Sequence, residues 1–129
     1  MKKIEVFIII DVSATLASGH IQSNVCIVDT NRWIGSWSDD ASTLHTVCLD
    51  RQSIGWRAQP VSLDDDVIIK GFGGQMVASR ICYPAKDGLR DGYWQGQVQT
   101  RGATGRYEYD VIVSLSGREF TFRSYINVN

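Results

Sequence analysis

The chain has 129 residues, enough for one ordinary domain but too few for two that each bury a core of their own. Hydrophobic residues make up 43% and charged residues 21%, a balance that excludes a disordered chain. The formal net charge of -1 gives no electrostatic reason to expect a nucleic acid or an anionic membrane as partner. We therefore treat residues 1–129 as one domain and expect neither of those partners.

Strand-forming residues dominate the composition. Isoleucine and valine are far more frequent than alanine and leucine, and aspartate, which favours turns, outnumbers glutamate. This imbalance argues against a helical bundle. The N-terminal apolar run, Val6–Ile10, is closed by Asp11. It is shorter than the roughly 7–15 residues of a secretory signal core and far shorter than the about 20 of a membrane-spanning helix.

The first half of the chain predicts strands separated by short polar segments. Lys3–Asp11 is apolar on both faces, which predicts a central strand buried on both sides. Ser13–Gly19 begins with a residue suited to a helix N-cap and ends in glycine, so one or two helical turns fit there. Asn24–Asp29 predicts a second buried strand. Ser42–Leu49 fits either a strand or a short helix.

The middle of the chain alternates extended segments with turns. Apolar and polar residues alternate over Ser53–Gln59, and Pro60 ends that pattern. From the same kind of pattern we expect strands over Val67–Phe72 and Tyr93–Thr100, an extended segment over Gln75–Tyr83, and a loop over Pro84–Gly92.

The C-terminal stretch predicts a β-hairpin. Two alternating segments, Arg106–Leu115 and Arg118–Val128, flank the dipeptide Ser116-Gly117, which is a two-residue hairpin signal. The register that this turn sets places the following residues opposite one another: Val113 and Phe120, Val111 and Phe122, Tyr109 and Ser124, Tyr107 and Ile126, Asp110 and Arg123, Glu108 and Tyr125. Nearly all apolar side chains then share one face, and opposite charges pair on the other.

Seven or eight short strands with turn signals about every ten residues and little helix predict an all-β fold. We expect an antiparallel β-sandwich, with a closed barrel as the alternative architecture.

The titratable residues indicate neither a metal site nor a catalytic centre. The cysteines, Cys26, Cys48 and Cys82, are widely spaced, and His45 belongs to no paired ligand motif. His45 and Cys48 form a thiol–imidazole pair only if their segment is helical. No nucleophile elbow of the Gly-x-Ser-x-Gly type occurs. We therefore expect no catalytic residues, no metal and no cofactor, and free buried thiols in a cytoplasmic protein.

Two further patterns fit ordinary turns better than ligand sites. Asp64–Asp66 lacks the rest of a calcium-binding loop, and we interpret it as a solvated turn. Gly71–Met76 begins like a dinucleotide-binding loop but has methionine where the third glycine belongs, and no helix pattern follows.

The tryptophans provide the candidate binding site. Trp56 and Trp94 fall on apolar strand faces and suit a core. Trp33 and Trp37 lie in a turn-like segment with Arg32 and Ser36. Indoles on loops can stack on sugar rings or flat ligands while polar neighbours bind hydroxyl groups. Core packing is the alternative explanation for Trp33 and Trp37.

The ordered series of short motifs resembles the PixA/AidA family of bacterial inclusion-body proteins along nearly the whole chain. The residues that carry the resemblance are Ile10-Asp11, Ala17-Ser18-Gly19, Asn24-Val25, Val28-Asp29-Thr30-Asn31, Ile54-Gly55-Trp56-Arg57, Gly74-Gln75-Met76-Val77, Arg80-Ile81-Cys82, Tyr93-Trp94-Gln95-Gly96, Arg101-Gly102-Ala103-Thr104-Gly105 and the Tyr107–Tyr125 hairpin.

The resemblance implies a small cytoplasmic bacterial protein without established catalytic residues, linked in some members to quorum sensing and in others to intracellular inclusions. The inclusion-forming type is rich in methionine, whereas this chain has only Met1 and Met76. This departure speaks against sulfur storage and favours the AidA-like branch.

Two functions therefore stand ahead of an enzyme. The first is a non-catalytic protein that associates with itself, as a homodimer or larger, through an edge strand or through the outer face of the C-terminal hairpin near Ile112 and Tyr125. The second is a module that binds a carbohydrate or another small ligand with Arg32, Trp33, Ser36 and Trp37.

Overall fold

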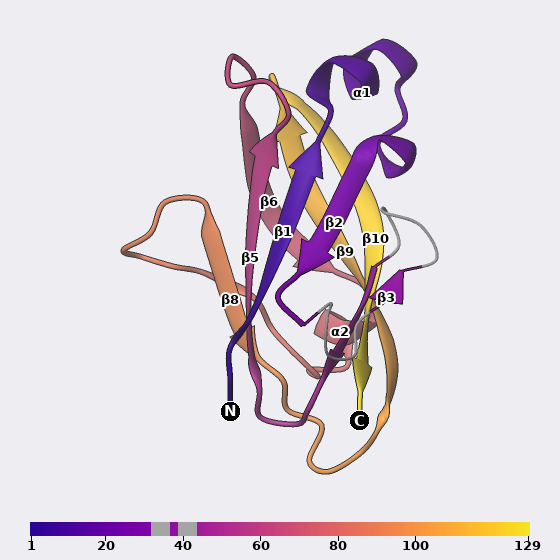
Figure 1. Ribbon diagram of the computed structural model, residues 1–129, viewed down its shortest axis with the longest axis vertical. Helices are drawn as coiled ribbons and strands as arrows, with labels where there is room; N and C mark the ends of the chain where they lie inside the picture. Colours follow the sequence, from indigo (N-terminus) through magenta and orange to yellow (C-terminus); the bar gives the residue numbers. More distant parts are fainter. Residues whose placement is uncertain (32–36, 39–43) are drawn as a thin grey trace.

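Two β-sheets packed face to face make up most of the molecule, as a computed structural model shows (Figure 1). The structure describes residues 1–31, 37–38 and 44–129, and at 37–38 it describes the backbone alone. The strands within these residues form two separate sheets of five. The predicted all-β sandwich is therefore confirmed.

The first sheet is the nearer layer in Figure 1 and has the strand order β2-β1-β5-β8-β7. Its strands are β2 (Val25–Asp29), β1 (Ile4–Ile10), β5 (Ser53–Pro60), β8 (Tyr93–Gln97) and β7 (Ala85–Lys86). β1 lies inside the sheet, as predicted, pairing antiparallel with β2 and parallel with β5. Only one face of β1 is buried, because Phe7 on the other face is 36% exposed. The expectation of burial on both faces is therefore wrong, since the outer face of this sheet meets solvent.

The second sheet has the strand order β3-β4-β10-β9-β6. Its strands are β3 (Trp37–Ser38), β4 (Leu44–Cys48), β10 (Arg118–Val128), β9 (Gly105–Leu115) and β6 (Val67–Gly73). The segment that fitted either a strand or a short helix contains the strand β4. This strand pairs parallel with β10.

Both sheets are thus mixed, and the described residues form ten strands where seven or eight antiparallel ones were predicted. The two parallel pairs join segments far apart in sequence, and such pairs need long crossover connections that a local pattern does not reveal. β3 and β7 have two residues each, too few to show any alternation.

The C-terminal hairpin has the predicted register in all six residue pairs. The turn residues Ser116 and Gly117 have φ angles of 50° and 83°. Positive φ at both central positions is the requirement of the type I′ turn, whose twist matches that of the flanking strands.

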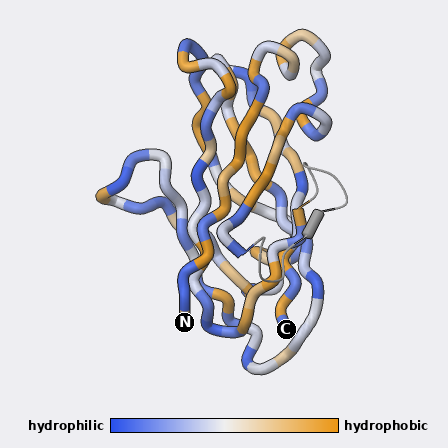
Figure 2. Tube along the Cα trace, in the orientation of Figure 1, coloured by the Kyte–Doolittle hydropathy of each residue, from blue (hydrophilic) through white to orange (hydrophobic). Residues whose placement is uncertain are grey.

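The hydrophobic core lies between the sheets. When the chain is coloured by hydropathy, β1 and β2 are mostly orange or pale, whereas the loop between β7 and β8 is mostly blue (Figure 2). The largest fully buried side chains of this core come from both sheets and include Trp56, Tyr109, Phe122, Ile8, Ile27 and Leu115. Trp56 packs against Phe72 and Tyr109, and Trp94 contacts Phe72, so the predicted core role of Trp56 and Trp94 is observed.

Two short α-helices and one 3-10 turn, η1 (Gln22–Asn24), connect the strands. α1 (Val12–Ser18) is the predicted helical segment, and Gly19 ends it with a φ of 76°. Its N-cap is Asp11, whose carboxylate accepts a hydrogen bond from the backbone of Ala14.

α2 (Gln75–Ala78) overturns the prediction of an extended segment over residues 75–83. Gly74, with a φ of 86°, redirects the chain after β6 into one helical turn. That turn buries Met76 completely in the core. A short apolar run does not by itself distinguish a strand from a buried helical turn.

Candidate functional site

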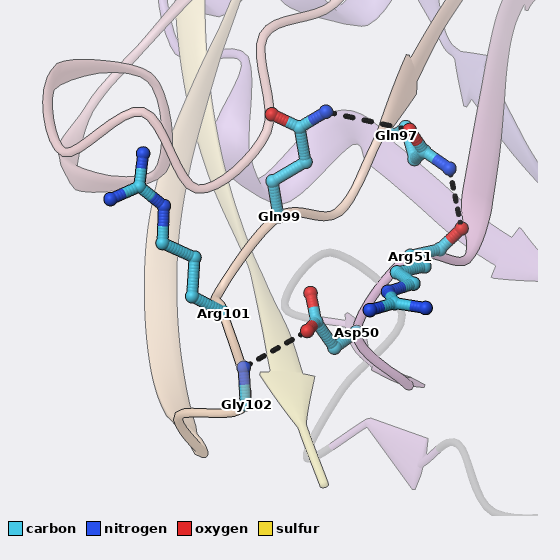
Figure 3. Close-up of a pocket in the computed structure, with 6 residues that line it drawn as sticks. All are labelled: Asp50, Arg51, Gln97, Gln99, Arg101 and Gly102. Atoms are coloured by element: carbon cyan, nitrogen blue, oxygen red, sulfur yellow. Dashed lines mark hydrogen bonds between the residues drawn. The ribbon is translucent and has the colours of Figure 1, made fainter.

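A polar cavity of about 810 Å³ opens at the end of the sandwich that carries both chain termini. Two connections meet there, the turn between β4 and β5 and the segment between β8 and β9. The residues that line it, drawn in Figure 3, are Asp50, Arg51, Gln97, Gln99, Arg101 and Gly102.

Asp50 joins the two connections. Its carboxylate accepts hydrogen bonds from the backbone N–H groups of Thr100, at 2.8 Å, and Gly102, at 2.9 Å. These bonds hold the pKa of the Asp50 carboxyl below its ordinary value. The backbone adds two more links, from Arg51 N–H to the Val98 carbonyl and from Val98 N–H to the Gln52 carbonyl. The floor of the cavity is therefore held in one arrangement.

Two arginines of the cavity adopt the left-handed backbone conformation. Arg51 has a φ of 74° and Arg101 a φ of 55°, and four described non-glycine residues in all have positive φ. For a residue with a Cβ this conformation costs on the order of 1 kcal/mol. Half of the described strained positions thus lie in one cavity, where the hydrogen bonds of Asp50 and Val98 stabilise them.

The glutamine side chains form a short chain of amide hydrogen bonds along one wall (Figure 3). Gln99 donates through Nε2 to Oε1 of Gln97 at 3.4 Å. Gln97 donates in turn to the carbonyl of Arg51 at 2.9 Å. This arrangement leaves the Oε1 atom of Gln99 as an acceptor at the rim.

Three charged side chains line the cavity: the cations Arg51 and Arg101 and the anion Asp50. Within the described residues, neither Arg51 nor Arg101 forms an ion pair. The Asp50 carboxylate is occupied by backbone N–H groups. The side chains that remain available to a ligand are therefore two guanidinium groups and amides.

The site predicted from the loop tryptophans lies mostly outside the described residues. This holds for Arg32, Trp33 and Ser36. Trp37 is in β3, where its backbone pairs with His45. A ligand site at these four residues stays a prediction.

The polar cavity was not predicted from the sequence. Asp50 and Arg51 had no predicted role, and Arg101 and Gly102 were named only among the residues that carry the family resemblance, because exposed polar residues in turns have no periodicity. The sequence signal was weak. It consisted of two dipeptides, Asp50-Arg51 and Arg101-Gly102, in two turns that flank strands of the same sheet.

The cysteines and His45 do not form a reactive pair. In the strand β4 residues three apart face opposite sides, and His45 stacks on Tyr125 with ring centroids 4.8 Å apart. Burial raises the pKa of the Cys48 and Cys82 thiols to about 12, which keeps them protonated at neutral pH. All three cysteines are free, and among the described residues no group of three His, Cys, Asp or Glu side chains could hold a metal ion.

Comparisons with known proteins identify a family and a shared fold, and they assign no function to this cavity. The family described as "Domain of unknown function (DUF8788)" matches residues 2–121. The crystal structure of the inclusion body protein PixA from Burkholderia cenocepacia J2315 is similar to this chain, with a TM-score of 0.68 at 9% sequence identity. The match covers 99% of this chain and 94% of that one. At this identity the likeness shows the fold alone, and the PixA-like fold expected from the sequence is thereby confirmed.

None of the curated proteins matches the chain by sequence. No helix within the described ranges is long and apolar enough to cross a membrane.

Proposed function

Because the chain belongs to the family described as a domain of unknown function (DUF8788) and shares its fold with an inclusion body protein, we propose that it is a non-catalytic protein whose copies associate with one another. We place it in the cytoplasm, where free thiols such as that of the partly exposed Cys26 stay reduced, and in intracellular inclusions at high abundance. The link to quorum sensing that its resemblance to the AidA-like branch implies stays a prediction.

The observation that carries the proposal is the edge strand β6. β6 ends the order of the second sheet and pairs on one side with β9; no strand among the described residues pairs with its other side. Ile68 in this strand is 52% exposed on the outer face of the sheet. An exposed edge with a large apolar side chain favours pairing with another copy.

Neighbouring apolar groups enlarge this surface. Ile112 of β9 is partly exposed on the same outer face, since it pairs with Gly71 while Ile68 pairs with Ser114. The loop between β7 and β8 projects from the body (Figures 1 and 2), and its residues Asp91 and Gly92 line a small pocket together with Ile68. Leu89 in this loop is 97% exposed. We call Ile68 and Ile112 the β6 surface.

Other features favour the β6 surface over the hairpin face around Tyr125. Tyr125 is half-buried, with the guanidinium of Arg106 4.1 Å from its ring centre and His45 stacked on it. A side chain already covered by its own chain offers little area to a partner.

The geometry of β6 limits how copies pair. A β-bulge interrupts the strand between Ile69 and Gly71, and the exposed Lys70 lies within it. Bulges and lysines on edge strands oppose continuous strand addition. Pairing is therefore restricted to residues 67–69 and to side-chain contacts, which favours a closed symmetric dimer over an open fibre.

Light scattering coupled to size-exclusion chromatography tests the proposal. We expect the unmodified protein to elute as a dimer and Ile68→Lys to elute as a monomer. Leu49→Lys is the matched control, because Leu49 is exposed to a similar extent, 49%, at the other end of the sandwich. Monomers for the unmodified protein at all concentrations, or dimers that persist in Ile68→Lys, would contradict the proposal.

A further inference from the structure

We propose that the cavity around Asp50 binds a small hydroxylated oxyanion, such as a sugar acid or a sugar phosphate, with Arg51 and Arg101 holding its anionic group. The proposal is independent of self-association, because the cavity lies at the end of the sandwich and shares no residue with the β6 surface.

The charge of the cavity selects an anion. Arg51 and Arg101 come from different connections and border the same opening, and neither has an acidic partner among the described residues (Figure 3). Guanidinium groups bind carboxylate and phosphate oxygens with paired, charge-assisted hydrogen bonds. With the Asp50 carboxylate counted against the two guanidinium groups, the cavity has a net charge of +1, and the carboxylate accepts from the N–H groups of Thr100 and Gly102 rather than pairing with either arginine.

The backbone supports a role for these arginines beyond folding. Glycine adopts positive φ without strain, and the chain uses glycine at the neighbouring Gly102, where φ is 85°. Arg51 and Arg101 hold the same conformation at an energetic cost. Two such arginines border one opening, and neither forms an ion pair within the described residues, which supports a role in holding a ligand.

The amide chain selects hydroxyl groups. The Gln97 amide bonds to the backbone and the Gln99 amide bonds to Gln97, so both are oriented before a ligand arrives. The Oε1 atom of Gln99 can then accept a hydrogen bond from a hydroxyl group, and the remaining amide hydrogens can donate to it.

The size of the cavity restricts the ligand to a small molecule. Ligand pockets usually have volumes of roughly 300–1,000 Å³, and this cavity has about 810 Å³. The net charge of -1 offers no extended basic surface for a nucleic acid.

An NMR titration of the full chain tests the proposal, with four probes: glucuronate, glucose 6-phosphate, inorganic phosphate and glucose. We expect glucuronate or glucose 6-phosphate to shift the Gln97 and Gln99 side-chain amide signals and the Gly102 backbone amide signal. Whichever of the two binds identifies carboxylate or phosphate as the preferred anion. Glucose and inorganic phosphate should bind at least about tenfold more weakly, since each lacks half of the contacts.

Asparagine substitutions separate binding from folding. Asparagine tolerates the left-handed conformation, so Arg51→Asn and Arg101→Asn should keep or raise the melting temperature while weakening binding about tenfold or more. Arg118→Asn removes an exposed arginine next to the β9–β10 turn and should leave binding unchanged. Absence of shifts with both sugar anions, equal binding of inorganic phosphate, or full affinity in both cavity variants would overturn the proposal.

Discussion

The hydroxyl of Tyr93 lies 2.8 Å from both carboxylate oxygens of Glu5, and this contact crosses directly above Gly55 on the outer face of the first sheet. The ring of Tyr93 is in turn covered by Arg90, whose guanidinium carbon is 3.9 Å from the ring centre, and by Lys3 at 4.8 Å. Tyr93 is therefore fully buried although it faces away from the core. A glycine in a strand has no side chain to pack against its neighbours, and an aromatic ring that covers it supplies the missing contacts and stabilises the strand.

This arrangement predicts that Gly55→Ala destabilises the protein by roughly 1–3 kcal/mol. A Cβ atom at residue 55 would lie 1.8 Å from the Tyr93 hydroxyl oxygen and 2.7 Å from Glu5 Oε2, so the ring must leave its place. Chemical denaturation measures the change. Gly71→Ala is the control, because a Cβ there meets nothing within 4 Å; equal effects of the two substitutions would contradict the explanation.

The hairpin turn predicts a stabilising substitution. Ser116 has positive φ in a type I′ turn, a position that asparagine occupies with less strain. We expect Ser116→Asn to raise the free energy of unfolding by about 0.5 kcal/mol and Gly117→Ala to lower it by about 1 kcal/mol. Thermal unfolding of both variants measures the effects, and a loss of stability in Ser116→Asn would rule out this turn type.

Asp50 predicts a pH-dependent contribution to stability. Its folded-state pKa is lowered, chiefly by the N–H groups of Thr100 and Gly102, so the charged form stabilises the fold above the ordinary pKa of 3.8. That contribution disappears as the pH falls through the lowered pKa. We therefore expect Asp50→Asn to be less stable than the unmodified protein at pH 7 and equally stable in strong acid. A difference that stays constant over the whole acid range would argue against this role.

The buried thiols and Tyr109 predict a loss of stability in alkali. Burial raises the pKa of Cys48, Cys82 and Tyr109 to about 12 in the folded protein, from ordinary values of 9.0 for cysteine and 10.0 for tyrosine. The folded state then holds these protons more tightly, so stability is complete below about pH 9 and is lost as the pH rises to about 12. Urea unfolding at several alkaline pH values should show a shallower decline for Cys82→Ala, and an unchanged slope would contradict the assignment.

The local parts of the fold could be predicted from sequence. The C-terminal hairpin was predicted pair by pair, because a two-residue turn sets the register and a slip by one residue would expose its apolar face. The α1 turn was also predicted, although its cap is Asp11.

Non-local pairing could not be predicted in the same way. Nothing in the local pattern shows that Ile4 pairs with Ile54, or that Tyr125 pairs with His45, in parallel. The polar cavity shares this difficulty, because the carboxylate of Asp50 meets the backbone of Gly102 only when the β4–β5 and β8–β9 connections, which join four strands of two sheets, come together. Its arginines carry no periodic signal, and their positive φ angles are visible only in the structure.

Hydrogen exchange of the β6 backbone amides, compared at low and high protein concentration, tests the central claim of self-association most directly. We predict that the amides of residues 67–69 become more protected as concentration rises, while those of Leu49 and Ser116 exchange at constant rates. Exchange at β6 that does not depend on concentration, over a range in which the protein stays folded, would contradict the claim.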